Sequence, residues 1–209
     1  MVLLRSFENL YIWNPLTRGY IYIPCPPKST IPLGHSRGIN FGFGLNQATN
    51  EYKVVGYVGY EDRSDNKNFC SCVSVCTLTS LSREPSWQTI EPPSWRTIES
   101  FDQYNTRLRD CTIPHVNGAL HWLATRIPRP RSRVILSFDL KDEVFKEIRH
   151  PHPTELFSKD VYFELVELGG LLCLFGIQLR VELHIWVMKQ YGVFGSWTKL
   201  SHPKFPNNI

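Results

Sequence analysis

Three cysteines spaced two and four residues apart, Cys70, Cys72 and Cys76, form the densest group of thiols in the sequence. They lie among valines and small residues, a composition that favours a β-strand. Side chains an even number of positions apart point to the same face of a strand. Zinc needs ligands that surround it tetrahedrally, which one strand face cannot supply. We therefore expect buried structural thiols here and no metal site.

The remaining thiols and imidazoles provide no motif for catalysis. The tract from His150 to Pro153 alternates His with Pro, but His residues on a proline-stiffened loop are more often plain loop residues than metal ligands. A Cys–His nucleophile pair stays open as an alternative, although no local signature supports it among Cys25, Cys111 and Cys173. Residues 42–44 read Gly-Phe-Gly and lack the pattern of a phosphate-binding loop. We predict no catalytic residue, no cofactor and no metal.

One segment concentrates positive charge without any acidic residue. It contains four arginines within eight positions, namely Arg126, Arg129, Arg131 and Arg133. Two prolines between them disfavour the interior of a sheet, so we expect a solvated loop. Such a loop could have no partner. Alternatively, its guanidinium groups could bind carboxylate or phosphate groups of a target protein, which makes these arginines the candidate protein-binding residues. Nucleic acid is not expected, since no interleaved aromatic residues or known fold motif accompany the arginines.

The elements that would carry these residues repeat one pattern four times. Each copy has an apolar strand, a short loop, and then an aromatic residue followed three positions later by Ile or Leu, with Pro at or soon after the end. The copies join residues 10–15 to 20–24, 73–78 to 87–92, 135–140 to 145–151, and 183–188 to 197–203. Another apolar strand precedes the last three copies at 52–57, 118–123 and 170–175, and residues 2–4 are available for the first.

Repeated meanders of three or four strands predict an all-β fold, a partial β-propeller-like array of about four antiparallel blades. Residues 161–166 are β-branched and aromatic, so they favour a strand over a helix. The segment 36–50 is glycine-rich, and its end, Asn46–Asn50, indicates a turn.

Composition agrees with a folded, β-rich protein. Hydrophobic residues make up 42% and aromatic residues 13% of the 209 positions, which argues against wholesale disorder. A net charge of +4 does not demand nucleic acid. The sequence has no apolar run long enough for a membrane span, and Met1–Arg5 is too short for a signal peptide. We expect an intracellular protein of the cytoplasm or nucleus, with mostly free thiols and no membrane partner.

Several blocks of sequence together resemble the F-box-associated domain of plant F-box proteins. They come in the family's order and cover almost the whole chain: LYIWNPLTR at 10–18, GFG at 42–44, NEYKVV at 50–55, VNGALHWL at 116–123, ILSFDL at 135–140, IWVMKQYG at 185–192 and SWTK at 196–199. The resemblance implies a kelch-related propeller. It also implies that the chain is the target-binding arm of an SKP–cullin–F-box ubiquitin ligase, in which a helical F-box binds the SKP-type adaptor.

The resemblance sets expectations for domain organisation as well. We expect residues 1–209 to be one F-box-associated domain truncated at both ends, with the F-box that would bind the adaptor missing, and with an unknown target protein. An open set of blades exposes strand edges, so we predict a poorly soluble or oligomeric chain.

Three other interpretations remain at this point: a kelch-like glycan-binding module, an enzyme with a Cys or His site, and a nonfunctional fragment. The glycan interpretation would use an aromatic set whose repeat positions favour blade-core packing instead, namely Trp13, Trp122, Trp186 and Trp197.

Overall fold

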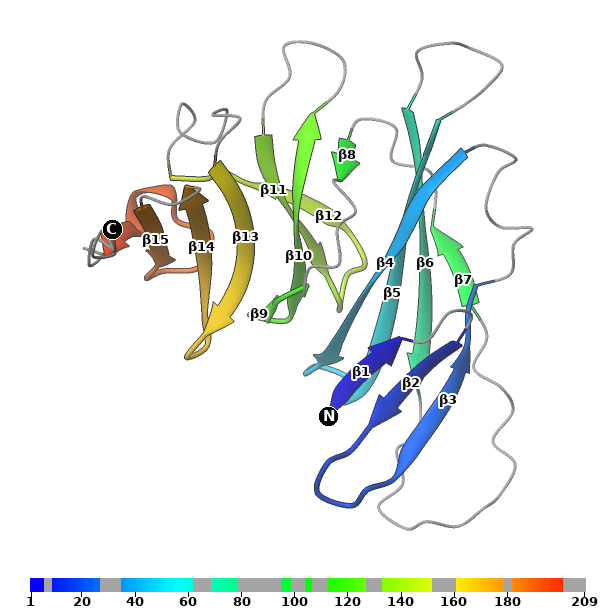
Figure 1. Ribbon diagram of the computed structural model, residues 1–209. Helices are drawn as coiled ribbons and strands as arrows, with labels where there is room; N and C mark the ends of the chain where they lie inside the picture. The colour runs from blue at the N-terminus through cyan, green and yellow to red at the C-terminus, as the bar shows by residue number, and fades with distance from the viewer. Residues whose placement is uncertain are drawn as a thin grey trace, which may run out of the picture.

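The protein folds into four antiparallel β-sheets that follow one another in chain order, with the first and last sheets at the two ends of the array (Figure 1). The computed structural model describes residues 1–5, 9–26, 35–61, 69–78, 95–98, 104–106, 113–126, 133–151, 161–178 and 182–200. Within these ranges, a short 3₁₀ turn, η3 (Phe194–Ser196), is the one helical element. The predicted all-β fold is confirmed.

Each sheet is a meander of neighbouring strands. Sheet A contains β1 (Val2–Arg5), β2 (Asn9–Trp13) and β3 (Tyr20–Pro24). Sheet B contains β4 (His35–Asn46), β5 (Glu51–Glu61), β6 (Phe69–Leu78) and β7 (Trp95–Ile98). Sheet C has the order β12 (Phe145–Ile148), β11 (Arg133–Asp139), β10 (Ala119–Arg126), β8 (Tyr104–Thr106), and β9 (His115–Val116) also pairs with β10. Sheet D contains β13 (Val161–Leu168), β14 (Leu171–Gln178), β15 (Glu182–Met188) and β16 (Trp197–Leu200).

The repeated sequence pattern forms the same structure in sheets A, C and D. The aromatic-x-x-aliphatic segment is an edge strand whose four residues pair with the last part of the preceding strand. In sheet C, Phe138 lies opposite Phe145 and Ile135 opposite Ile148. The same spacing joins β2 to β3 and β15 to β16. The predicted pairings of copies one, three and four are therefore confirmed.

Sheet B corrects the prediction for the second copy. Two near-identical hexapeptides occur in tandem, Ser-Trp-Gln-Thr-Ile-Glu at 86–91 and Ser-Trp-Arg-Thr-Ile-Glu at 94–99. The strand that pairs with β6 is the downstream one, with Cys76 opposite Trp95 and Val73 opposite Ile98. Sequence analysis named the upstream segment, 87–90, which lies outside the described residues. Equal β-propensity in the two hexapeptides left the sequence no basis for choosing between them.

The glycine-rich segment forms a strand that sequence analysis did not assign. β4 runs for 12 residues to Asn46, and the predicted turn follows it at 47–50. Glycine is needed there because sheet C approaches closely. A Cβ atom on Gly44 would lie 2.6 Å from the ring of His115 and 2.7 Å from Leu140 Cδ1. The strand expected at 161–166 is confirmed as part of β13.

Side chains on alternate positions of each strand build an apolar core between each pair of neighbouring sheets. In β5, Val54 faces sheet A and Val55 faces sheet C. The buried residues of the three cores are Leu10, Ile12, Ile23, Val54, Cys76 and Leu78 between A and B; Val55, Tyr57, Val73, Val75, Leu120, Trp122, Phe138 and Leu140 between B and C; and Val116, Ile135, Ile148, Phe163, Leu165, Leu172, Leu174, Trp186 and Met188 between C and D. We call these the A/B, B/C and C/D seams. Sheets that pack face to face in series are the architecture of propeller blades.

Candidate protein-binding surface

The arginine-rich segment lies at one end of sheet C. β10 ends at Arg126 and β11 begins at Arg133, and Thr125 pairs with Arg133 across the hairpin. The structure thus brings Arg126 and Arg133 to the same end of the hairpin. Arg129 and Arg131 lie outside the described residues, so their role as binding residues stays a prediction.

Arg126 already has a partner within the protein. Its Nε donates to Glu147 Oε1 at 3.1 Å, and its Nη2 donates to Glu147 Oε2. Glu147 belongs to β12, two strands away in the same sheet. The guanidinium fork therefore binds an intramolecular carboxylate in the bidentate manner that was expected for a target. The side chain of Arg126 remains 48% exposed, so a stronger anion can reach it.

Sheets B, C and D have comparable strand ends at one end of the molecule. The second and third strands of the three meanders are β5 and β6, β10 and β11, and β14 and β15. In each pair, the former strand ends and the latter begins at the upper end in Figure 1. The intervening sequences, 62–68, 127–132 and 179–181, contain Asp, Arg and Lys residues. A propeller presents its loops at its ends, where they can vary without disturbing the cores. Of the candidate arginines, Arg126 and Arg133 lie at this end, where β10 ends and β11 begins.

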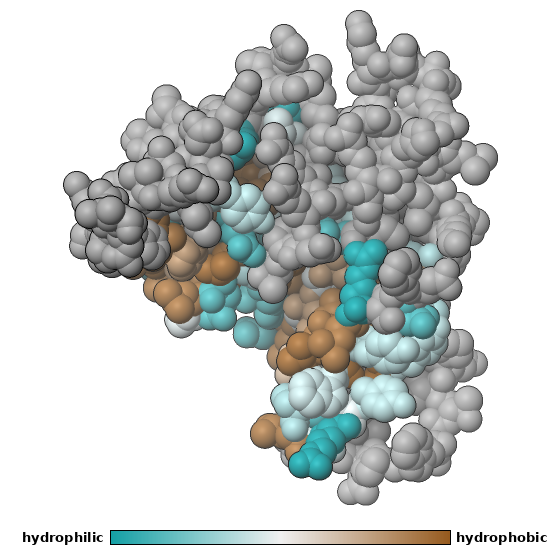
Figure 2. Space-filling view, in the orientation of Figure 1, coloured by the Kyte–Doolittle hydropathy of each residue, from teal (hydrophilic) through white to brown (hydrophobic). Residues whose placement is uncertain are grey.

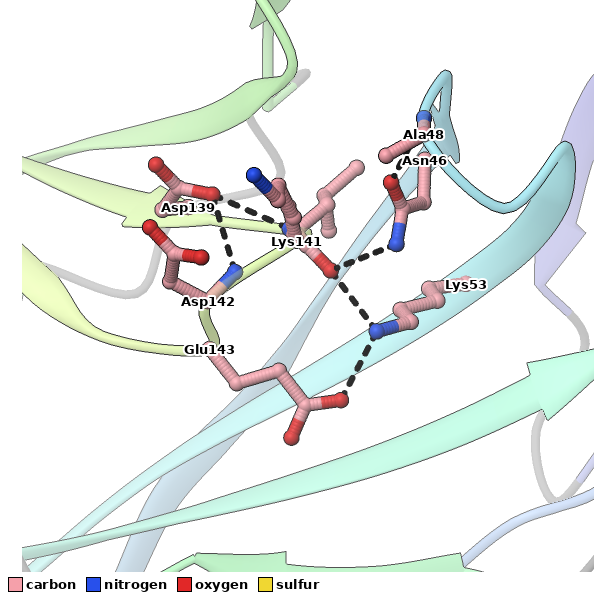
Figure 3. Close-up of polar contacts among 8 residues, drawn as sticks. Asn46, Ala48, Lys53, Asp139, Lys141, Asp142 and Glu143 are labelled. Carbon is pink, nitrogen blue, oxygen red and sulfur yellow. Dashed lines mark hydrogen bonds and ion pairs between the residues drawn. The ribbon is translucent and has the colours of Figure 1, made fainter.

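The opposite end of sheets B and C is fastened by a polar network (Figure 3). Lys53 Nζ donates to the carbonyl oxygen of Leu140 at 2.7 Å and to Glu143 Oε1 at 2.8 Å. Asn46 Nδ2 donates to the same carbonyl at 3.3 Å. Lys53 is only 5% exposed. Glu143 lies in the β11–β12 turn of sheet C with a φ of 54°, and its side chain reaches Lys53 on β5. The network holds two blades together.

A second buried network joins sheets C and D. His121 Nδ1 lies 3.2 Å from the carbonyl oxygen of Pro114, so it carries the proton and donates. His121 Nε2 then accepts from the hydroxyl of Tyr191 at 2.8 Å, and Ser137 Oγ lies 3.0 Å from that hydroxyl. Burial lowers the pKa of His121 to about 4, which keeps the imidazole neutral at pH 7. Burial likewise raises the pKa of Tyr191.

The Ser137–Tyr191–His121 chain combines groups that occur in hydrolytic sites, but its burial excludes that use. Ser137 is 3% and His121 1% exposed, and both hydroxyls are committed to the network. A nucleophile must be reachable by its substrate. These three hydrogen-bonded residues therefore form a bridge between sheets C and D.

The cysteines with described side chains, Cys25, Cys76 and Cys173, are free thiols. Cys76 is fully buried in the A/B seam, and burial raises its pKa to about 11. Cys70, Cys72 and Cys76 all belong to β6, as the predicted strand requires, and the side chains of Cys70 and Cys72 lie outside the described part of the structure. In the described part of the chain, no three His, Cys, Asp or Glu residues are grouped to hold a metal ion.

The tryptophans divide between core and surface. Trp122 and Trp186 are buried in the B/C and C/D seams, and Trp197 packs against the latter. Their prediction as blade-core residues is confirmed. Trp13 instead lies on the exposed side of sheet A, close to tyrosines that sequence analysis did not single out, Tyr20 and Tyr22. The alternation of Tyr with Ile in β3 was the available signal.

No helix among the described residues is long and apolar enough to cross a membrane.

Comparison with known proteins agrees with this architecture. The profile of the F-box associated beta propeller domain matches residues 1–204. In Arabidopsis thaliana, F-box protein At3g07870 is 34% identical over 92% of this chain and 45% of its own length. F-box protein CPR1 is 30% identical over 98% of the chain and 50% of its own length, and F-box/kelch-repeat protein At3g23880 is 25% identical over 92% and 47%.

Four serial antiparallel sheets with matching edge strands define a β-propeller type of domain. The chain belongs to the F-box associated beta propeller family. It spans about half the length of the curated relatives it matches. The predicted resemblance to plant F-box proteins is confirmed.

Proposed function

We propose that this chain is the target-binding arm of an SKP–cullin–F-box ubiquitin ligase, acting in the cytoplasm or nucleus. The observation that carries the proposal is the match of the F-box associated propeller profile to residues 1–204. Similarity to proteins named as F-box proteins supports the same role. Adaptor binding would belong to an F-box, and residues 1–209 would supply the propeller that selects the target.

In this role the protein performs no bond chemistry. It holds a target close to the ubiquitin-transfer machinery, which raises the effective concentration of the target's lysines. The surface we assign to target binding is the end of sheet C that carries Arg126, Arg129, Arg131 and Arg133. An acidic or phosphorylated segment fits it, because guanidinium forks bind carboxylate and phosphate bidentately. The Arg126–Glu147 pair is an intramolecular example of a guanidinium group that binds a carboxylate in this way.

Affinity capture tests the arginine surface. The tagged chain and its Arg129→Glu/Arg131→Glu variant are expressed in plant cells, and captured proteins are compared by quantitative mass spectrometry. A matched control reverses two exposed charges at the opposite end, Lys141→Glu/Lys189→Glu. We expect specific partners to be depleted by the first change and kept by the second. Identical partners for wild type and the arginine variant would remove this surface from the proposal.

Transcript sequence tests the ligase role separately. The region upstream of the Met1 codon is sequenced from full-length complementary DNA. We expect a helical F-box encoded in the same reading frame. A stop codon directly upstream in every transcript would separate this chain from adaptor binding and would overturn its role in a ligase.

A further inference from the structure

The edge-strand position of sheet B has two candidate occupants in the sequence. The tandem hexapeptides at 86–91 and 94–99 differ only at Gln88 and Arg96. Residues 95–98 of the second hexapeptide form β7, which pairs with β6. The first hexapeptide has the same aromatic-x-x-aliphatic pattern, so its strand propensity is the same. We call 86–91 the upstream copy and 94–99 the downstream copy.

The upstream copy offers β6 almost the same partners as β7 does. The pairs in the structure are Trp95–Cys76, Arg96–Val75, Thr97–Ser74 and Ile98–Val73. A shift of eight positions along the chain brings Trp87, Thr89 and Ile90 to the places of the Trp, Thr and Ile of β7. Only the partner of Val75 changes, from Arg to Gln. Cross-strand pairs are the unit of sheet stabilisation, so pairing itself gives little preference for one copy.

An edge strand of this kind is easier to replace than a central strand. It pairs on one side only, and it buries few side chains: in each of β12 and β16, which hold the same position in their sheets, two of the four residues are exposed. Pale and brown side chains over sheet A, at the lower right of Figure 2, include the exposed side of its edge strand β3, where Tyr20 is 68% and Tyr22 49% exposed. Exchange therefore breaks one short ladder and removes little apolar burial.

The lengths of the connecting segments permit both pairings. With the downstream copy in place, residues 79–94 join β6 to the edge strand and 99–103 join it to β8. With the upstream copy in place, the connecting segments are 79–86 and 91–103. The first is then as long as the segment 189–196 that joins β15 to β16. Closure entropy changes the equilibrium by factors of about three and about four in opposite directions, so the two changes nearly cancel.

We propose that the two copies exchange at the edge of sheet B, so that β6 pairs with the downstream copy in one state and with the upstream copy in the other. Exchange to the upstream copy adds eight residues to the segment that leads into β8. Tyr104, the first residue of β8, lies opposite Arg126. The longer segment thus precedes the end of sheet C that carries the candidate arginines. An effect on target binding rests on the proposed function, whereas the exchange itself does not.

A double-mutant cycle tests the exchange without any target. Ile98→Asp and Ile90→Asp each place a charge at the position opposite Val73 in one copy and leave the other copy intact. Ile148→Asp is the matched control, because it changes the corresponding position of β12, for which the sequence has no second copy. Urea denaturation measures the equilibrium constant for unfolding of each protein.

We expect Ile98→Asp to raise this constant by about 2- to 10-fold, because the upstream copy takes the place of β7, and Ile90→Asp to raise it at most about twofold. The double variant should raise it about 30-fold or more, as Ile148→Asp does, because neither copy then fits. A double variant no less stable than Ile98→Asp, additive losses, or an Ile98→Asp loss equal to that of Ile148→Asp would each overturn the proposal.

Fluorine NMR of the protein labelled with fluorotryptophan shows directly which copy pairs with β6. Trp87→Phe and Trp95→Phe assign the two signals. In Ile98→Asp, the signal of Trp87 should take the chemical shift that the Trp95 signal has in the wild type. If the Trp87 signal keeps its wild-type shift in that variant, the exchange does not occur.

Discussion

The B/C and C/D seams have similar apolar cores but different polar bridges. At the B/C seam the bridge is charged: the Lys53 ammonium binds Glu143 and the Leu140 carbonyl. At the C/D seam it is neutral: Tyr191 joins the His121 imidazole to the Ser137 hydroxyl. Both bridges connect a strand of one sheet to a turn of its neighbour.

Access to water accounts for the difference. The Glu143 side chain keeps 16% of its surface exposed, so one end of the charged bridge stays partly solvated. His121 is almost fully buried, and burial disfavours the charged form of its imidazole. A buried charge needs a partner and further hydrogen bonds, whereas a buried neutral group needs hydrogen bonds only. Apolar burial supplies the attraction at both seams, and the bridges fix the relative position of the sheets.

Removing the acid from the charged bridge should have the largest effect. Glu143→Ala leaves the buried ammonium of Lys53 without its counter-ion, because only uncharged acceptors such as the Leu140 carbonyl remain. We expect a loss of about 3 to 4 kcal/mol in the free energy of unfolding, measured by urea denaturation. Lys53→Met should lose less, because it removes the buried charge and keeps most of the side-chain volume.

The double variant provides the control for that result. Lys53→Met/Glu143→Ala should be about as stable as Lys53→Met alone, because the double variant has no buried ammonium that could lack a counter-ion. Additive losses in the double variant would show that the two side chains act independently and that the buried pair does not hold the seam.

The neutral bridge should make stability depend on pH. The pKa of His121 is lowered from its ordinary 6.5 to about 4 by burial, so the unfolded chain binds this proton more readily. The contribution is fully present above pH 6.5 and is lost as the pH falls from 6.5 toward 4. A shift of this size corresponds to about 3 kcal/mol.

Comparison with a variant isolates that contribution. His121→Gln keeps a polar side chain but does not titrate, so its free energy of unfolding should fall by about 3 kcal/mol less than that of wild type between pH 7 and pH 4. Equal slopes for the two proteins would mean that His121 is not held neutral.

Loss of the hydroxyl alone should have an intermediate effect. Tyr191→Phe leaves His121 Nε2 without its donor and Ser137 without this partner, at a cost of about 1 to 2 kcal/mol by thermal or urea unfolding. Tyr20→Phe is a suitable control because its hydroxyl is on an exposed side chain. A loss no larger at Tyr191 than at Tyr20 would contradict the bridge.

The sequence predicted the sheets better than the seams. Strand pairing within a sheet depends on local alternation, so β10, β11 and β12 could be anticipated from Leu120, Phe138 and Phe145 with their short connections. β4 was missed because Gly42 and Gly44 lower strand propensity. Their purpose is the close approach of sheet C, which no local pattern reveals.

The bridges could not be predicted for the same reason. Lys53 and Glu143 are 90 positions apart, and each looks like an ordinary surface residue in sequence. The candidate arginines show the opposite case. Their composition was informative, but no pattern in the sequence indicates that Arg126 binds Glu147, 21 positions further along the chain.

Loss of the Arg126–Glu147 pair should have the smallest effect on the free energy of unfolding. This exposed pair contrasts with the buried Lys53–Glu143 pair. Its side chains are 48% and 29% exposed, so water solvates both charges when the pair separates. We expect Arg126→Gln to change the free energy of unfolding by at most about 0.5 kcal/mol, and less at high salt. Urea denaturation at low and high salt measures this. A loss above about 2 kcal/mol would place this pair with the buried bridges and would make Arg126 a structural residue, because a guanidinium that stabilises sheet C so strongly is not available to a target.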